Sequence, residues 1–247
     1  MRRALFSLLT LVTLAGLAEA QSVGKLGLSS LVPSPEHPQE LAAALKLLLG
    51  LSVLSLAPAL LIMLTSFTRT IIILSFLRSA LGTQQTPPNA ILVGLALFLT
   101  FSIMYPTWQK IDSQALQPYL SGKMRYDLAV DKAAVPLRQF LLRQTREKDL
   151  GLFVTLSHSP RPQTEADIPM RVLIPAFIIS ELRSGFQIGF VLFIPFVVVD
   201  LIVASVLMSM GMMMLPPVMI SLPIKILLFV MVDGWHLITK SIVLSFG

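Results

Sequence analysis

The charged residues of this chain are concentrated in one stretch, and this segregation limits what the chain can fold into. Residues 108–171 hold ten of its 19 lysines and arginines and seven of its 13 aspartates and glutamates. The whole chain of 247 residues is 55% hydrophobic and only 13% charged, whereas soluble domains carry about 25% charged residues. Such a chain cannot coat a globule with polar surface, and it has too little charge for disorder. The pattern predicts an all-α, integral membrane-type protein with one polar insert.

The apolar stretch before the insert has the spacing and length of a helical hairpin. In this first hairpin, residues 41–106, a helix kinked at Pro58 is expected to run as far as residue 81. Pro87 and Pro88 then form a turn, and the second helix is expected to end near Pro106.

The apolar stretch after the insert, residues 172–247, predicts a second hairpin. Its one strong break is at Pro216 and Pro217, so helices are expected over 186–215 and 218–244. The organisation is therefore two long kinked helical hairpins that flank a polar helical insert.

The N-terminal 20 residues have the three parts of a secretory signal peptide. A basic start and an uncharged apolar run precede Ala18-Glu19-Ala20, so we expect cleavage after Ala20. The alternative is an uncleaved first membrane helix, although the run is short for the about 20 residues that a span requires. Residues 21–40 are rich in glycine and proline and are expected to form a linker.

The position of positive charge suggests a topology. The loop between the first two helices is expected to carry Arg69 and Arg78 on the cytoplasmic side, because cytoplasmic loops are rich in basic residues. The insert, residues 107–171, then lies outside the cytoplasm. Within it, helical spacing covers 135–150 and a proline-rich loop covers 157–169.

The residues required for an enzyme or a metal site are missing from the sequence. There is no cysteine, the three histidines are isolated, and no nucleophile or nucleotide-binding motif is present. We therefore expect no catalytic activity, no metal and no cofactor. The net charge of +6 fits anionic lipid better than nucleic acid in so apolar a chain.

Two charges lie inside apolar runs of the second hairpin. Asp200 and Lys225 each stand among aliphatic residues, where an unpaired charge costs several kcal/mol. If the hairpin turns at Pro216, the two are about 9 Å out of register along the helices, which a lysine side chain can largely cover. We hypothesise that they pair within one chain or between neighbours. The alternative is that each reaches water.

Methionines are concentrated just before the break in the second hairpin. Met212, Met213 and Met214 follow Gly211 directly. Because methionine is unbranched and adapts its shape, such side chains could form a soft ring if several copies surround an axis. From composition alone, the simpler interpretation is that they pack against lipid or core.

A small-residue spacing lies earlier in the same hairpin. Gly185 and Gly189 are four positions apart, which lets two helices approach closely. This spacing is common by chance and is only weak evidence for oligomerisation.

Several long strings in the chain together resemble the FliP family of flagellar type III export-gate proteins. They cover most of the chain after the signal peptide, and they include FTRTIIILSFLRSALG, SELRSGFQIGF, DLIVASVLMSMGMMMLPP and SLPIKILLFVMVDGWHL. These strings lie at 67–82, 180–190, 200–217 and 221–237, within five longer matching stretches at 58–89, 94–101, 174–190, 193–217 and 221–237.

The resemblance implies a role that the residues alone do not give. FliP-like chains form a helical ring of about five copies, joined by FliQ-like and FliR-like subunits, around a channel for unfolded flagellar subunits in the bacterial inner membrane. It implies that Met212, Met213 and Met214 form the pore gasket and that Asp200 and Lys225 are the membrane charge pair. FlhA-like and FlhB-like proteins would be further partners at the flagellar basal body, with the insert on the periplasmic side.

Three other functions remain open. An injectisome carries an equivalent export-gate subunit, although the signal peptide and the long insert resemble the flagellar branch. A small-molecule or ion transporter would show an internal repeat, and the two hairpins show no clear one. A structural assembly factor that never lines the pore is the third.

Overall fold

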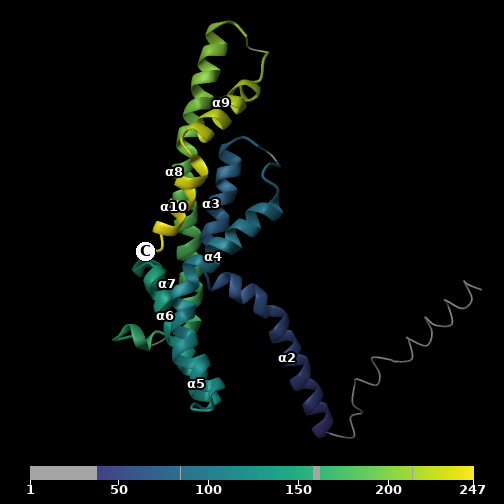
Figure 1. The fold of residues 1–247 in the computed structure, drawn as a ribbon, viewed down its shortest axis with the longest axis vertical. Helices are drawn as coiled ribbons and strands as arrows, with labels where there is room; N and C mark the ends of the chain where they lie inside the picture. Colours follow the sequence, from purple (N-terminus) through teal and green to yellow (C-terminus); the bar gives the residue numbers. More distant parts are fainter. Residues whose placement is uncertain (1–37, 84, 158–161, 213) are drawn as a thin grey trace, which may run out of the picture. The chain divides into compact units, whose positions relative to one another are not determined.

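A computed structural model describes residues 38–157 and 162–247, except for Gln84 and Met213 (Figure 1). Within those residues the regular structure is entirely helical, as the sequence predicts. Ala18 and Ala20 of the expected cleavage site, and residues 21–37 of the expected linker, lie outside the described residues. The chain divides into two compact units, residues 1–58 and 59–247.

The first described helix, α2, spans Pro38–Met63 and continues through Pro58. The sequence predicts a single kinked helix as far as residue 81, but the chain leaves the helix at residues 64–66 and α3 begins at Phe67. Thr65 explains the break. Its hydroxyl donates to the Ile62 carbonyl at 3.1 Å and accepts from the Phe67 N–H at 3.5 Å, so it competes with the helical backbone bonds.

The first hairpin consists of α3 (Phe67–Ala80) and α4 (Asn89–Ile111). The expected end of the second helix near Pro106 is wrong, because α4 continues for more than a turn beyond that proline. A proline removes only one donor and can be accommodated by a bend. A π-helical turn, η2 (Asp112–Leu116), and a short helix, α5 (Gln117–Leu120), prolong the same helical run.

The polar insert contains α6 (Tyr126–Gln144), α7 (Glu147–Leu156) and a 3-10 turn, η3 (Glu165–Asp167). The single helix expected over 135–150 is therefore two helices. Thr145 and Arg146 are extended between them, and the Thr145 hydroxyl donates back to the Leu141 carbonyl at 2.7 Å, which closes the end of α6.

The second hairpin starts earlier than expected. Its first helix, α8 (Met170–Ser209), has 40 residues and contains Pro175 and Pro195. The returning arm is broken into α9 (Pro217–Met231) and α10 (Gly234–Leu244), which differ in direction by 66°.

Asp233 and Gly234 cause the break in the returning arm. Asp233 has a left-handed backbone conformation with φ of 49°, which a non-glycine residue rarely adopts. A Cβ on Gly234 would lie 2.2 Å from the Phe229 ring, so only glycine permits this close turn of the chain.

Two hydrophobic clusters hold the second unit together. One joins α3, α4, α8, α9 and α10, and the other joins α6, α7 and α8. Both include α8, the long green helix in Figure 1, and α3 lies along it. Gly185 and Gly189 lie on this contact, because a Cβ on either would meet Ile72 or Phe76 of α3. The two glycines therefore pack helices within one chain.

Two helical stretches of the described residues are long and apolar enough to cross a membrane. They are residues Asn89–Leu120 and Met170–Ser209, and the bent pair α9 and α10 would be a third if it counts as one span. The described part of the chain thus has the membrane-type helical character that its composition predicts.

Candidate functional site

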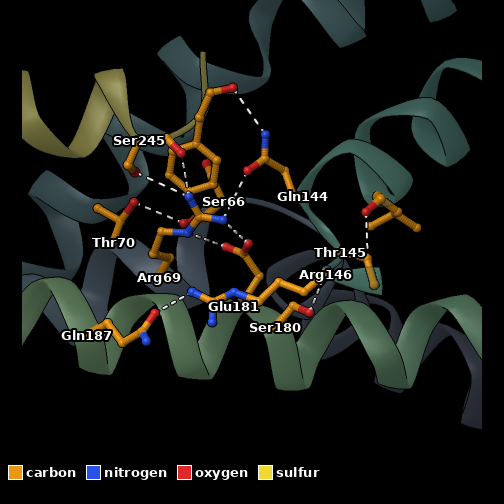
Figure 2. A network of polar contacts seen from close by, with 12 residues as sticks. Ser66, Arg69, Thr70, Gln144, Thr145, Arg146, Ser180, Glu181, Gln187 and Ser245 are labelled. Atoms are coloured by element: carbon orange, nitrogen blue, oxygen red, sulfur yellow. Dashed lines mark hydrogen bonds and ion pairs between the residues drawn. The ribbon is translucent and has the colours of Figure 1, made fainter. Parts of the chain in front are cut away.

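The most buried polar cluster lies where four helices meet. We call it the polar junction, and define it as Arg69, Gln144, Ser180, Glu181 and Ser245. Arg69 is 4% exposed and Glu181 is fully buried. Figure 2 shows Arg69, from α3, between Glu181 of α8 and Ser245 at the end of α10. Buried charges are costly unless they are paired and hydrogen-bonded, and here they are both.

Arg69 is the centre of the junction. Its Nε donates to Glu181 Oε2 at 3.1 Å, and its Nη2 donates to Glu181 Oε1, so the carboxylate is held in the bidentate geometry typical of arginine. Nη2 also donates to Gln144 Oε1 at 3.0 Å. Nη1 donates to the Ser245 carbonyl at 2.6 Å. One guanidinium therefore connects α3, α6, α8 and the residues after α10.

A second set of bonds attaches α7 to the same part of α8. The Ser180 hydroxyl donates to Asp149 Oδ2 at 2.8 Å and accepts from the Arg146 N–H at 3.0 Å. Arg183 lies 3.6 Å from the other Asp149 oxygen, and Arg146 donates to Gln187. At the break between α6 and α7, the Arg146 N–H therefore donates to the buried Ser180 hydroxyl instead of to a helical carbonyl.

A separate charge pair joins the two arms of the second hairpin. Lys225 Nζ of α9 lies 2.6 Å from Asp200 Oδ2 of α8, and the Ser221 hydroxyl donates to Asp200 Oδ1 at 2.6 Å. The lysine side chain is 6% exposed, whereas that of Asp200 is 38% exposed. The structure therefore brings together, within one chain, the two charges that the sequence suggests as partners.

The methionine turn lies at the far end of α8. We use this name for residues 210–216, between α8 and α9. Gly211 has φ of 74°, which reverses the chain after the helix. The side chain of Met212 is exposed and Met214 is 98% exposed; Met213 lies outside the described residues. The structure therefore places the side chains of Met212 and Met214 at the surface of the chain, at the tip of the second hairpin.

The two arginines assigned to a cytoplasmic loop are not in a loop. Both lie within α3. Arg78 donates to Asn89 Oδ1 at 2.5 Å, across the turn to α4, whereas Arg69 is buried in the polar junction. The segment that carries them continues the helical pattern expected as far as residue 81, and it packs on α8 as the separate helix α3.

The polar junction is the feature that reasoning from the sequence missed. Reasoning from the sequence places Arg69 in a loop and assigns no partner to Glu181, although Glu181 lies in an apolar run. The signal was available, because two isolated opposite charges in apolar helices call for pairing. Glu181 of the junction, Asp200 of the charge pair and the methionine turn follow one another along α8 and past its end, and the structure does not merge them into a single site.

No group of three or more acidic, histidine or cysteine side chains that could hold a metal ion occurs in the part of the chain that the structure describes. The arrangement of the paired charges is suited to fixing helices against one another. Its chemistry is that of a structural joint between helices.

Comparison with known proteins gives one consistent family. The sequence model of the FliP family matches residues 50–242. The Flagellar biosynthetic protein FliP of Bacillus subtilis is 55% identical over 213 residues, which is 86% of this chain and 96% of that protein. The proteins of the same name from Caulobacter vibrioides and Aquifex aeolicus are 54% and 47% identical, over 81% and 83% of this chain and 75% and 87% of their own lengths.

Proposed function

This chain belongs to the FliP family, and from that membership we propose that it is a pore-forming subunit of the flagellar protein export gate. The family and the apolar helices support an inner-membrane component of flagellar biosynthesis. The proposed role is more specific than membership of that system: copies of the chain surround a channel through which unfolded flagellar subunits leave the cytoplasm.

The methionine turn is the observation that carries this proposal. Met214 is 98% exposed at the tip of a hairpin, and the neighbouring Met212 is exposed too. Methionine side chains are unbranched and adapt to irregular surfaces. Several copies around an axis would place Met212, Met213 and Met214 as a gasket, which seals against ions and deforms around a passing chain.

The Asp200–Lys225 pair would keep the gasket in place. It lies in the same hairpin as the methionine turn and joins the outgoing arm to the returning arm. Removing one partner would leave the other charge buried or half-buried and unpaired, which is strongly destabilising. The pair would therefore hold the spacing of the two arms that determines where the methionines stand.

Exposed apolar faces support an assembly in the membrane. Large hydrophobic side chains on α8 and α9 are exposed in the isolated chain, and such surfaces need lipid or protein to cover them. We assign them to neighbouring copies in a ring of about five, to FliQ-like and FliR-like subunits, and to lipid. They include Phe186, Phe190, Val191, Leu201, Ile202, Met219, Val230 and Met231.

The proposed topology places the insert in the periplasm. The insert carries most of the charge of the chain and so belongs in water. With the signal peptide removed, α6 and α7 would lie on the periplasmic side and the methionine turn toward the cytoplasmic side. The energy for export would come from partner proteins, since the sequence contains no nucleotide-binding motif, and FlhA-like and FlhB-like proteins would be among the partners.

Ion conductance through the assembled gate tests the proposal. The triple variant Met212→Ala, Met213→Ala, Met214→Ala should leak ions when co-expressed with FliQ-like and FliR-like subunits, because alanine cannot fill the gap. The matched control is Met219→Ala with Met231→Ala, which removes exposed methionines of α9 from outside the turn. Unchanged conductance in the triple variant, in a complex of normal mass, would contradict a methionine gasket.

A structural assembly factor is the second candidate, favoured if the turn never meets substrate. A photo-crosslinker at Met214 should capture a stalled flagellar substrate in the export gate but not in the assembly-factor alternative. Complementation of a flagellar and of an injectisome deletion strain separates those two export systems. Native mass spectrometry of the complex separates a ring from a monomeric transporter.

A further inference from the structure

The turn between α3 and α4 lies against the charge pair of the other hairpin. A Cβ on Gly82 in this turn would be 3.9 Å from Lys225 Nζ and 3.9 Å from Leu222 Cδ1, both on α9. Figure 1 shows the turn just below α9. Gly82 of the first hairpin therefore lies beside the Lys225 end of the charge pair.

Two properties of position 82 make it suited to this contact. Gly82 has φ of 76°, a conformation that glycine adopts readily and that asparagine and aspartate tolerate best among other residues. It also lies at the end of α3, where the chain has to turn sharply toward α4. Gly122 and Gly211 have φ of 71° and 74°, but nothing lies within 4 Å of a Cβ on either. Gly122 and Gly211 therefore have the same backbone conformation as Gly82 but lack its contact with α9.

Lys225 can serve more than one neighbour. An ammonium group has three donors, and its bond to Asp200 at 2.6 Å uses one of them. At 5% exposure, the ammonium has little access to water. Its surroundings are therefore set by α8, α9 and whatever the α3–α4 turn places beside it.

We infer that Gly82 is a positioning residue for the Asp200–Lys225 pair, and that this pair docks the first hairpin onto the second as well as joining α8 to α9. If the α3–α4 turn moves away from α9, Lys225 becomes exposed to water. Conversely, loss of the Asp200–Lys225 pair makes the turn more mobile. The consequence for gating, that the α3–α4 turn supports the arm carrying the methionines, rests on the proposed function.

Relocating the carboxylate tests the inference. Asp200→Asn should lower the unfolding temperature of the detergent-extracted complex, because Lys225 loses its counter-charge. Adding Gly82→Asp should recover at least half of that loss, since an aspartate there reaches Nζ. Gly122→Asp and Gly211→Asp, each in the Asp200→Asn background, are the matched controls and should recover nothing. Absence of recovery with Gly82→Asp, or equal recovery with all three, would overturn the inference.

A second measurement does not depend on the rescue. The chain contains no cysteine, so Gly82→Cys gives a single thiol whose reaction with a maleimide reports how closely the turn is covered. Adding Asp200→Asn should raise that rate several-fold and leave the rate of Gly122→Cys unchanged. An unchanged rate at position 82 would also overturn the inference. Neither measurement requires ion conduction or export, so failure of the proposed gate would be seen separately.

Discussion

The guanidinium carbon of Arg69 lies 3.9 Å from the centre of the Phe246 ring. A cation over an aromatic face is attracted to it, most strongly where water is excluded. Phe246 also stacks on Phe140 of α6, with ring centres 6.5 Å apart, and its carbonyl accepts from Gln144 Nε2 at 3.1 Å. The residues that follow α10 are thus anchored on the polar junction by a ring and by two carbonyls.

Removing the ring should release α10 locally. In Phe246→Ala, we expect hydrogen exchange of residues 234–246 to accelerate about a hundredfold or more, while α4 stays protected. Truncating a buried aromatic costs about 3–5 kcal/mol, and each 1.4 kcal/mol corresponds to a factor of about ten. Phe190→Ala is the control, because that ring is exposed. Exchange that is equal in the two variants would show that the ring does not anchor α10.

Separating the partners of the buried ion pair should destabilise the fold more than replacing both. Arg69→Met or Glu181→Met alone leaves a buried charge without its partner, at a cost of about 3–5 kcal/mol. The double variant removes both charges and should unfold at a higher temperature than either single variant. Thermal unfolding of the detergent-extracted chain measures this order.

An exposed ion pair provides the comparison for the buried one. Arg125 and Asp127 are 3.1 Å apart, with side chains 86% and 70% exposed. Exposed pairs contribute about 0–1 kcal/mol, so Arg125→Ala should change the unfolding temperature little. A similar drop for Arg125→Ala and Arg69→Met would argue against a special role for the junction.

Gly189 should not tolerate a methyl group. In Gly189→Ala the new Cβ would lie 2.6 Å from Phe76 Cγ, so α3 and α8 must move apart. Overpacking of this kind costs about 1–3 kcal/mol. Gly94→Ala is the matched control within a helix, because its Cβ meets nothing within 4 Å. We expect a lower unfolding temperature only for Gly189→Ala, and Phe76→Leu should restore part of it.

The 3-10 turn of the insert should depend on pH. The hydrogen bond from the Thr164 side chain, followed by its backbone N–H, lowers the pKa of Asp167 below its ordinary value. A depressed folded pKa stabilises the turn above the unfolded pKa, and this contribution is lost as pH falls through the folded pKa. Thr164→Val should raise the Asp167 pKa in a carboxyl-carbon NMR titration. An unaltered titration would contradict the capping interaction.

The fold class followed from residue type and order because hydrophobic burial and backbone bonding are local to each apolar run. The turns before Asn89 and Pro217 followed as well, since α4 and α9 begin at these residues, but other helix ends did not. Thr65 and Thr145 end helices through their own hydroxyl groups, whereas Pro58 and Pro106 lie inside helices that continue. Proline signals a missing donor, but tertiary packing decides whether the helix stops there.

The candidate site was predictable where both partners lie in one hairpin. Asp200 and Lys225 are 25 residues apart on the two arms of one hairpin, and a lysine side chain can cover most of the offset of about 9 Å that a turn at Pro216 predicts. Arg69 and Glu181 are 112 residues apart, in different hairpins, and no spacing rule brings them together. Their contact depends on how α3 packs on the glycine face of α8, which the sequence alone does not specify.

Pro195 divides α8 between the polar junction and the charge pair. The segment beyond it, 14 residues to Ser209, is about 21 Å long at 1.5 Å per residue. This segment would tilt as one rigid piece if α8 bends at Pro195, where the backbone donor is missing. A tilt of about 5° there would move the tip by about 2 Å on this length, roughly half the width of one methyl group. In the proposed ring, the opening between the hairpin tips of neighbouring copies could therefore widen without unfolding any helix.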